Sequence, residues 1–389
     1  MTYIHEQPNW PAFTWNAAVL ATPLAAVRHK QGRHLGRMEN LGFDLRTEAS
    51  LEVLTEDAIK TSAIEGEALA RSEVRSSVAR RLGIEAGGIA NPSREVEGIV
   101  TMMMDATQEF ASSLTAERLC AWHAALFPTG WSGLSRITTG AFRLPSSDPM
   151  QVVSGHVGHE TVHFEAPAAA RLEAEVRAFL DWFESPPPID PVLFAGIAHF
   201  WFITLHPFED GNGRIARAIG DMALARGDHS KERFYSLSSQ IEKERKQYYT
   251  ELEAAQCADL DLTPWLAWFL GVLDRALDAS ETILSAVLRK HDLWKRLRAH
   301  PLHDRQSLVL NRLTSDFQGH LTTSKYARMT KCSPDTALRD IRELIEWGAL
   351  VKNPGAIRPV TRPLRSARNR GSQARSAGPD QLPSSVQPL

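Results

Sequence analysis

The sequence has few cysteines, almost no net charge and no long apolar run. Its three cysteines, Cys120, Cys257 and Cys332, lie far apart, which excludes a cysteine-based zinc motif and a disulfide framework and favours a reducing compartment. A net charge of −2 gives no general attraction to nucleic acid or to a membrane surface. No stretch reaches about 18 uninterrupted apolar residues, and no basic segment followed by an apolar run opens the sequence. We therefore expect neither a membrane span nor a signal peptide, and a cytoplasmic location.

What the sequence does have is length and helical periodicity. With 389 residues, of which 43% are hydrophobic, it can bury a large core and divide into two or three domains. No repeat of fixed period is visible. Apolar residues recur at helical spacing over residues 96–110, 116–127, 168–183 and 191–205. The central part of the chain is therefore predicted to be mainly α.

The most informative stretch is residues 206–217, His206-Pro207-Phe208-Glu209-Asp210-Gly211-Asn212-Gly213-Arg214-Ile215-Ala216-Arg217. The apolar run before it predicts a helix that ends at His206, because proline disfavours α conformation in the residue before it. The amphipathic run after it predicts a second helix that begins at Gly211-Asn212-Gly213 and ends near Gly227. Free backbone N–H groups at a glycine-rich helix start form an anion site.

The charges of this stretch indicate what the anion is. Arg214 and Arg217 share one face of the first turn, where the helix dipole disfavours each cation by about 0.3–1 kcal/mol. A polyphosphate would neutralise them, Asp210 would be the hard oxygen ligand that Mg²⁺ prefers, and His206 would be close enough to accept a proton. Each feature alone is usually structural, but together they indicate nucleotide chemistry. The P-loop pattern is not matched.

These residues resemble the Fic-family signature His-Pro-Phe-x-Asp/Asn-Gly-Asn-Gly-Arg-x-x-Arg at every fixed position. The resemblance implies a protein adenylyltransferase, which transfers AMP from ATP to a Ser, Thr or Tyr hydroxyl of a protein and releases diphosphate. It implies that His206 is the general base, that Asp210 binds Mg²⁺, that Gly211, Asn212 and Gly213 hold the phosphates, that Arg214 and Arg217 bind the outer phosphates, and that Phe208 anchors the motif in the core.

Residues 51–65 are predicted to form a second notable helix, which Gly66 ends. Its core stripe consists of Leu51, Leu54, Ala58 and Ser62. Thr61 and Glu65, four residues apart, share a face. The helix dipole disfavours an anion in the last turn, so Glu65 requires a cation, for which Arg217 is the candidate. From spacing alone, a solvated glutamate is the favoured interpretation.

A resemblance to a known sequence pattern favours the ion pair over the solvated glutamate. Thr61-Ser62-Ala63-Ile64-Glu65-Gly66 is similar to the Ser/Thr-x-x-x-Glu-Gly/Asn inhibitory helix of Fic proteins, here on the N-terminal side of the catalytic motif. The resemblance implies that Glu65 pairs with Arg217 and blocks the productive γ-phosphate position. The chain is thus predicted to be autoinhibited, with Glu65 and Thr61 as inhibitory residues.

Residues 159–163, His-Glu-Thr-Val-His, fit the His-Glu-x-x-His pattern of zinc proteases, which needs a helix. Here glycines precede the pattern and β-forming residues dominate it, so a strand is the better interpretation. Residues four apart in a strand are separated by about 13 Å and cannot share one zinc ion. We expect instead a hairpin in which residues 151–153 pair with residues 161–164.

Such a hairpin resembles the flap of Fic proteins, which covers the active site and holds the target by strand addition. The predicted flap residues that bind the target are Val162, His163 and Phe164. Upstream, Gly140-Ala141-Phe142-Arg143 resembles the Gly-x-Phe/Tyr-Arg that leads into the flap. Downstream, Tyr248 and Tyr249 in a predicted helix over residues 240–252 resemble the tyrosines near the adenine pocket, and ordinary half-buried aromatic residues are an equal alternative.

The two ends of the chain carry further predictions. Residues 1–85 contain a predicted helix over residues 23–41, and the paired Trp10 and Trp15 resemble the N-terminal domain often joined to Fic modules. Residues 321–341 read as a helix, a tight turn and a helix capped by Ser333 before Pro334, which resembles the helix-turn-helix of winged-helix domains. The second helix carries the acidic residues Asp335, Asp340, Glu343 and Glu346. These favour a protein contact or packing over DNA binding.

We therefore predict a mainly α protein: a Fic-fold helical bundle with a β-hairpin flap, plus a C-terminal winged-helix-like domain whose wing is incomplete. The expected parts are an N-terminal helical domain at residues 1–85 with the inhibitory helix at 51–66, a Fic catalytic domain at 86–280, a helix-turn-helix domain at 281–357 and a disordered tail at 358–389.

The predicted function is an autoinhibited protein adenylyltransferase that uses ATP and Mg²⁺ on a target-protein hydroxyl. Three alternatives stay open: Glu65 positions water so that the chain removes AMP, another nucleotide is the donor, or a winged-helix regulator uses a Fic-like core only to sense nucleotide. The sequence does not decide whether the chain forms a homo-oligomer.

Overall fold

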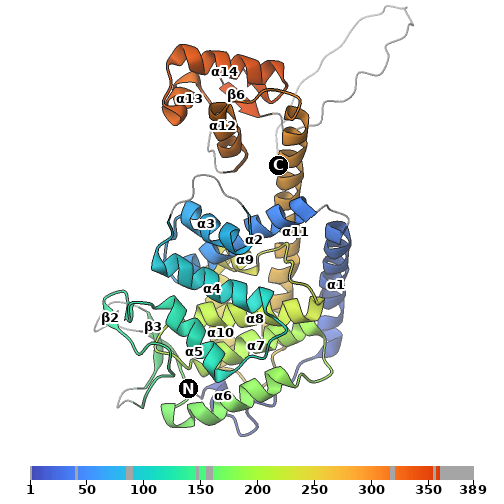
Figure 1. The fold of residues 1–389 in the computed structure, drawn as a ribbon. Helices are drawn as coiled ribbons and strands as arrows, with labels where there is room; N and C mark the ends of the chain where they lie inside the picture. The colour runs from blue at the N-terminus through green and yellow to red at the C-terminus, as the bar shows by residue number, and fades with distance from the viewer. Residues whose placement is uncertain are drawn as a thin grey trace, which may run out of the picture. The chain divides into compact units, whose positions relative to one another are not determined.

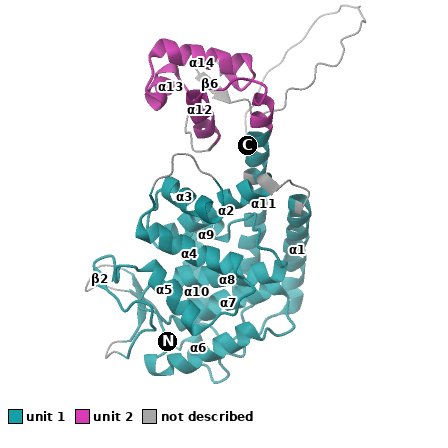
Figure 2. Ribbon diagram, in the orientation of Figure 1, with its two compact units in different colours: residues 1–291 teal, residues 292–389 magenta. Residues whose placement is uncertain are grey.

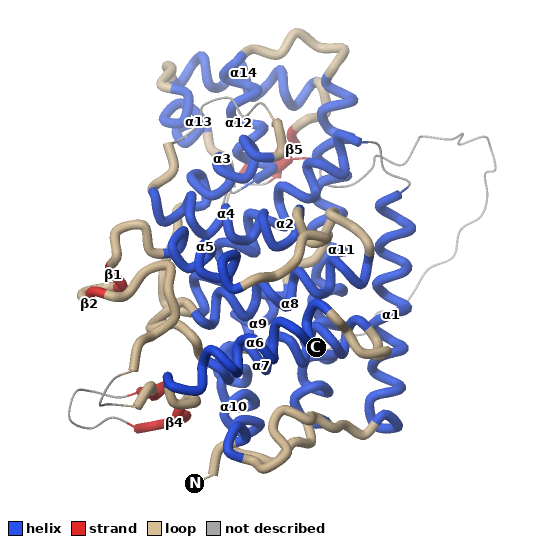
Figure 3. The backbone as a smooth tube through the Cα atoms, turned by 60° about the horizontal axis from the view of Figure 1, so that its bottom comes forward, coloured by secondary structure: helices blue, strands red, loops and turns tan. Residues whose placement is uncertain are grey.

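The computed structural model describes residues 2–39, 43–84, 91–145, 149–154, 161–315, 320–353 and 356–359. The chain divides into two compact units, residues 1–291 and 292–389 (Figure 2). Within the described ranges both units are built from helices, and each strand pairs with one neighbour in a two-stranded sheet. The four strands of the first unit lie together at one edge of its helical body (Figure 3). The predicted mainly α fold is confirmed.

The first unit begins with a short 3₁₀ turn, η1 (Ile4–Glu6). Its helices are α1 (Ala17–Glu39), α2 (Phe43–Ile64), α3 (Arg71–Arg81), α4 (Arg94–Gln108), α5 (Ala116–Leu126), α6 (Ala169–Glu184), α7 (Pro191–Leu205), α8 (Asn212–Asp228), α9 (Leu237–Lys243), α10 (Arg245–Gln256) and α11 (Thr263–Leu297), whose last turns belong to the second unit (Figure 1). Its strands are β1 (Trp131–Ser132), β2 (Ser135–Arg136), β3 (Gln151–Ser154) and β4 (Thr161–Glu165). The bounds of α4 to α7 agree with the predicted helices to within two residues.

The core of this unit is built around α7. Every residue from 192 to 205 is buried, and a helix that is apolar on all sides needs a partner on each side. Helices α6 and α8 pack against it. On another face Gly196 lets α11 approach closely, because a Cβ atom there would lie 2.9 Å from Leu266 Cδ2. Since His206 ends α7 and Asn212 begins α8, the predicted site lies between the two most tightly packed helices.

The N-terminal segment is attached to this core by aromatic residues. The Trp10 indole N–H donates to Glu175 Oε2 at 2.8 Å, and the Trp10 ring lies edge-on to Trp201 of α7, with 6.2 Å between ring centroids. The Phe13 ring packs edge-on against the rings of Phe200 and Trp201, both of α7. The packing role predicted for the paired tryptophans is therefore present, with Trp15 also half-buried against the core.

Two helices begin earlier than the sequence predicted. Helix α1 begins at Ala17 and contains Pro23. Proline removes the N–H that would bond to residue i−4, here Val19, and Val19 lies at the surface, where it is 54% exposed. Helix α2 begins at Phe43, eight residues before the predicted start.

The predicted helix over residues 240–252 is instead two helices, α9 and α10, which meet at Glu244. The Glu244 carboxylate accepts hydrogen bonds from Arg275 Nε at 2.7 Å and Nη2 at 2.6 Å. Because Arg275 belongs to α11, a tertiary contact holds the bend, and no local residue pattern signals it.

The second unit contains α12 (Asp304–Ser315), α13 (Thr323–Thr330), α14 (Pro334–Glu346), β5 (Leu350–Asn353) and β6 (Ala356–Pro359). Helices α13 and α14 form the predicted helix-turn-helix, with Ser333 Oγ accepting from the Thr336 N–H at 3.2 Å. The prediction of an incomplete wing is wrong, because β5 and β6 pair as an antiparallel hairpin. Four-residue strands leave too little alternation for a sequence pattern to detect.

The acidic face predicted for α14 also needs a correction. Asp340 is only 1% exposed, and it accepts hydrogen bonds from the Tyr326 hydroxyl and from Arg305 Nε, both at 3.0 Å. It therefore belongs to the core of the second unit and adds no negative charge to the surface that a DNA phosphate would meet. DNA binding by this unit stays a less favoured prediction on the remaining acidic residues.

Two predictions from composition concern the membrane and the tail. Among the described residues, no helix combines the length and the apolar character needed to cross a bilayer. Residues 360–389, which hold most of the predicted tail, lie outside the described residues. The predicted start of the tail at residue 358 is wrong, because Arg358 and Pro359 belong to strand β6 and pair with β5.

The close crossing of α4 and α5 allows a stability test. A Cβ atom at Gly98 would lie 1.8 Å from the Ala125 carbonyl oxygen, so Gly98→Ala should force the helices apart and lower the free energy of unfolding by about 1–3 kcal/mol. At Gly32 in α1 a Cβ atom meets nothing within 4 Å, so Gly32→Ala should raise it by about 0.5–1 kcal/mol. Thermal denaturation of both variants measures this, and a Gly98→Ala variant as stable as wild type would contradict the described crossing.

Candidate active site

The loop between α7 and α8 holds His206 in an unusual backbone conformation. His206 has φ 48° and ψ 55°, a left-handed conformation that non-glycine residues adopt rarely. Arg143, from the predicted Gly-x-Phe-Arg segment, fixes it: its Nε donates to the His206 carbonyl at 2.9 Å and its backbone N–H to the Pro207 carbonyl at 2.9 Å. The strain is thus held by a neighbouring segment, as often seen at functional sites.

Asn212 and Phe208 close the same loop from within. The Asn212 side chain accepts from the Phe208 N–H at 3.0 Å and donates to the Phe208 carbonyl at 2.8 Å. The Phe208 ring is fully buried and stacks on His123, with 4.3 Å between ring centroids. Phe208 therefore takes the anchoring position implied by the resemblance. The Asn212 side chain is 2% exposed and shapes the loop, so only its backbone remains to meet a phosphate.

The His206 imidazole is arranged to accept a proton. Its Nδ1 lies 3.3 Å from the Ile203 carbonyl, which can only accept, so Nδ1 carries the hydrogen and Nε2 keeps a free lone pair. Burial lowers its pKa to about 4, against a smaller opposing effect of the Ile203 hydrogen bond. The side chain is therefore neutral at physiological pH, the form that a general base needs.

The start of α8 has the properties of an anion site. Gly211 has φ 78° and lacks a side chain that could cap the helix, so the first backbone N–H groups remain available to a ligand. The backbone at Gly213 is open to a very close approach: a Cβ atom there would lie 2.2 Å from Glu65 Oε1. A side chain at residue 213 would thus exclude the carboxylate that lies there in this structure.

That carboxylate forms an ion pair with Arg217. Arg217 Nη2 donates to Glu65 Oε1 at 2.7 Å and to the Thr61 carbonyl at 2.9 Å, and its Nε donates to Thr61 Oγ1 at 2.7 Å. Arg217 is only 2% exposed, and its Nη1 has no hydrogen-bond partner within the described part of the chain. The predicted contact is present, and Thr61 and Glu65 both point at the arginine as their spacing required.

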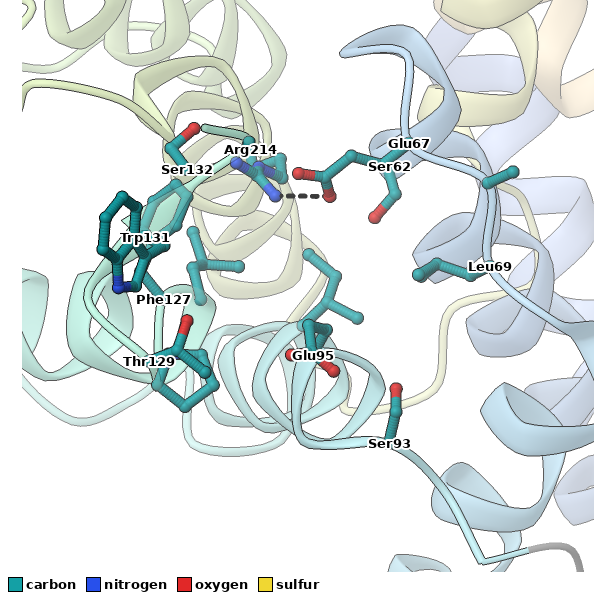
Figure 4. A pocket seen from close by; sticks show the side chains of 15 residues that line it. Ser62, Glu67, Leu69, Ser93, Glu95, Phe127, Thr129, Trp131, Ser132 and Arg214 are labelled. Atoms are coloured by element: carbon teal, nitrogen blue, oxygen red, sulfur yellow. Dashed lines mark hydrogen bonds and ion pairs between the residues drawn. The ribbon is translucent and has the colours of Figure 1, made fainter. Parts of the chain in front are cut away.

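Arg214 has a carboxylate partner that the sequence analysis missed. Its Nη1 donates to Glu67 Oε2 at 2.7 Å, and its guanidinium lies over the Phe127 ring, 4.9 Å from the centroid. Figure 4 shows this pair at the side of a cavity of about 520 Å³ that Trp131 and Ser132 also line. The available signal was an acidic residue two positions after Glu65, but nothing in the spacing directs it toward Arg214.

Asp210 is oriented for a ligand role. Its carboxylate accepts from the Ser132 hydroxyl and from the Gly211 N–H, which fixes the plane of its oxygens. Among the described residues no cluster of three or more His, Cys, Asp or Glu could hold a metal ion. Mg²⁺ in phosphate-transfer sites is usually held by one or two carboxylates together with substrate phosphates and water, so a single carboxylate beside an anion site fits that ion.

The hairpin predicted as a flap is present as strands β3 and β4. They pair antiparallel with Val153 opposite Val162, and the register shifts between Val152 and Val153. Phe164 is 1% exposed and contacts the Tyr3 ring, so it anchors the strand and is not free to contact a target. Val162 is 44% exposed.

The third predicted flap residue, His163, holds the flap against a helix. Its Nε2 lies 2.6 Å from Ser154 Oγ and its Nδ1 lies 3.0 Å from Glu253 Oε2 of α10. The rest of the zinc-like pattern, His159 and Glu160, lies outside the described residues. His163 itself belongs to strand β4, as the strand interpretation requires.

The two predicted adenine-pocket tyrosines differ in burial. Tyr248 is 1% exposed, and its hydroxyl lies 3.0 Å from His199 Nε2 within the core. This placement favours ordinary packing over a ligand contact. Tyr249 is 36% exposed and its hydroxyl lies 3.3 Å from the Ile64 carbonyl and 3.4 Å from Glu65 Oε2. Tyr249 therefore borders the site near its surface, whereas Tyr248 lies beneath the site, where its hydroxyl also interacts with Arg217.

The comparison with protein families agrees with this geometry. Residues 113–224 match the Fic/DOC family, and residues 3–84 match DUF4172, a domain of unknown function. The chain contains a Fic domain. Residues 206–217, which form the anion site described above, lie within this matched region.

Two curated relatives match part of the chain. The chain is 32% identical over 117 residues to Protein adenylyltransferase Fic of Nematostella vectensis, which is 29% of this chain and 25% of that protein. It is 30% identical over 122 residues to Protein adenylyltransferase fic-1 of Caenorhabditis elegans, which is 30% of this chain and 22% of that protein. The match thus spans about a quarter of the length of these relatives.

A solved structure extends the similarity beyond the matched family region. A crystal structure of a Fic family protein from Desulfovibrio desulfuricans G20 aligns with 91% of this chain and 99% of its own, with a TM-score of 0.54 and 21% sequence identity. At that identity the likeness concerns the fold. The chain therefore has the helical Fic fold.

The loop closure by Asn212 can be tested on stability. Asn212→Asp keeps the size of the side chain but cannot donate to the Phe208 carbonyl, so the buried pair loses a hydrogen bond and the free energy of unfolding should fall by about 1–3 kcal/mol. Asn9→Asp, at an exposed position, is the matched control and should change it by less than about 0.5 kcal/mol. Equal stability of the two variants in thermal denaturation would show that the loop does not depend on this bond.

Proposed function

We propose that this chain is an autoinhibited protein adenylyltransferase, which transfers AMP from ATP to a hydroxyl side chain of a target protein. The observation that carries the proposal is the Glu65 carboxylate over Gly213, paired with the buried Arg217. An internal carboxylate there occupies the place that a phosphate of the substrate would take. The names of the curated relatives support the same reaction.

The catalytic step follows from the described residues. When ATP is bound, the backbone N–H groups of Asn212 and Gly213 and the guanidinium of Arg217 hold its phosphates, in place of Glu65. The Gly211 N–H stays bonded to the Asp210 carboxylate. The target hydroxyl oxygen attacks the α-phosphorus, the bond to the bridging oxygen of the diphosphate breaks, and His206 Nε2 takes the hydroxyl proton. Asp210 would hold Mg²⁺, which supplies charge neutralisation on the phosphates.

The flap would present the target. Strand β4 offers backbone groups and the exposed Val162 side chain, so an extended target segment can add as a further strand. Backbone pairing positions a hydroxyl near His206 without strong dependence on the target sequence. Phe164 and His163 keep the strand attached to the first unit, through Tyr3 and Glu253.

The direct test uses the inhibitory residue. In Glu65→Gly, Arg217 is free, so self-labelling by ATP with label in the α-phosphate should rise by about tenfold or more, the equivalent of one lost hydrogen-bonded ion pair. Mass spectrometry should show the addition of one AMP. Labelling unchanged from wild type would contradict inhibition by Glu65.

A second substitution separates transfer from nucleotide sensing. His206→Ala in the Glu65→Gly background should lower the labelling rate by about 10²–10⁴-fold while ATP binding persists, as measured by calorimetry. His206→Asn, which tolerates the left-handed backbone better, controls for local strain. Binding without transfer in Glu65→Gly itself would favour the sensor alternative, and loss of AMP from a modified protein would favour removal.

The pH dependence follows from the lowered pKa of the partly buried base, His206. His206 has a pKa of about 4 because burial disfavours its charged form. It therefore becomes protonated, and inactive as a base, only at pH values below that pKa. For Glu65→Gly, kcat/KM should therefore stay flat from about pH 5 to 8, whereas an exposed histidine would lose half its activity near pH 6.5. Loss of Glu65 removes a nearby negative charge that raises this pKa, so the flat range is kept. A half-loss near pH 6.5 would show that another group is the base.

A further inference from the structure

We propose that Glu67 is a second inhibitory residue, so that Glu65 and Glu67 together form a two-carboxylate clamp on both arginines of the anion site. The inference rests on the proposed function and concerns the regulation of the same site. Its basis is the ion pair between Glu67 Oε2 and Arg214 Nη1 at 2.7 Å, which stands beside the pair between Glu65 and Arg217. A phosphate that binds Arg214 must displace Glu67, as one that binds Arg217 must displace Glu65.

The backbone after α2 directs both carboxylates to one place. The N–H groups of Glu65 and Glu67 both donate to the Ser62 carbonyl at 3.0 Å. Gly66 between them has φ +90°, a conformation that favours glycine. This tight turn points side chains 65 and 67 at the first turn of α8, where Arg214 and Arg217 lie three residues apart. The clamp is therefore one element with two contacts.

The burial of the two partners is unequal, which allows the clamp to open. The Arg214 side chain is 4% exposed and that of Glu67 is 47% exposed. A buried guanidinium without an anion is costly, whereas a half-exposed carboxylate is readily solvated by water. Arg214 Nε also has no hydrogen-bond partner among the described residues. Arg214 thus stays in place and exchanges one anion for another, and Glu67 is the partner that moves.

There is room for that movement. The cavity of about 520 Å³ beside Arg214 is lined by Glu67 and, across it, by Ser93 and Glu95 (Figure 4). A rotation of the Glu67 side chain into this space displaces no core residue.

The first arm of the test measures binding. Calorimetry with inorganic triphosphate and with ATP, each with Mg²⁺, should show tighter binding to Glu67→Gln than to wild type by about three- to tenfold, as expected for removal of one half-exposed competing carboxylate. The double variant Glu65→Gly with Glu67→Gln should bind more tightly than either single variant. Its α-phosphate labelling should exceed that of Glu65→Gly by a similar factor.

Two controls separate the contact from the charge. Glu95→Gln removes one exposed negative charge from the same cavity. It should leave binding within about twofold of wild type, because no hydrogen bond or ion pair joins its carboxylate to Arg214 in the described part of the chain and solvent screens its charge. Glu67→Asp keeps the charge but shortens the side chain by one methylene. It should resemble Glu67→Gln if the contact matters.

The outcomes are distinguishable. If Glu65→Gly binds and labels but Glu67→Gln and Glu67→Asp match wild type, the second contact has no inhibitory role and the proposed function stands. Weaker binding in Glu67→Gln would mean that Glu67 positions Arg214 for the phosphate, which also overturns the inference. If the double variant, with an unchanged melting temperature, neither binds triphosphate nor labels, both the inference and the proposed function fall.

Discussion

Two buried cations at the start of a helix require an anion, and the first unit is organised around that requirement. Arg214 and Arg217 are almost fully buried, and the dipole of α8 disfavours positive charge at that end. Desolvation makes a guanidinium without a partner costly. In this structure, carboxylates about 150 residues earlier in the chain supply the partner. The same requirement explains how an internal acid and an external phosphate can compete for one place.

The catalytic loop between α7 and α8 is held rigid by hydrogen bonds and packing contacts from other segments. His206 keeps a left-handed backbone because Arg143 donates hydrogen bonds to the carbonyls of His206 and Pro207. Asn212 closes the loop and Phe208 anchors it. A base held this way loses little entropy when substrate binds. The inhibitory helix is equally fixed, since buried Asp57 of α2 accepts a hydrogen bond from the Ser238 N–H at 3.2 Å.

Much of the fold and part of the site followed from local patterns. The apolar spacing located α4 to α7, and the glycine-rich loop located the start of α8, because burial of one helix face and the backbone needs of a turn act over a few residues. The helix continuing through Pro23 and the bend at Glu244 were missed, since each depends on exposure or on partners far along the chain. The complete wing was missed because its four-residue strands leave too little alternation for a sequence pattern to detect.

The sequence by itself determined the chemical inventory: a histidine before proline, a glycine-rich helix start, two arginines and a glutamate four residues after a threonine. Only the tertiary structure decided which charges meet. It placed Glu67 on Arg214, withdrew Tyr248, Phe164 and Asp340 into the core, and turned Asn212 toward its own loop. The physical reason is that burial and pairing of a side chain depend on all the segments packed around it, which no local pattern of residues specifies.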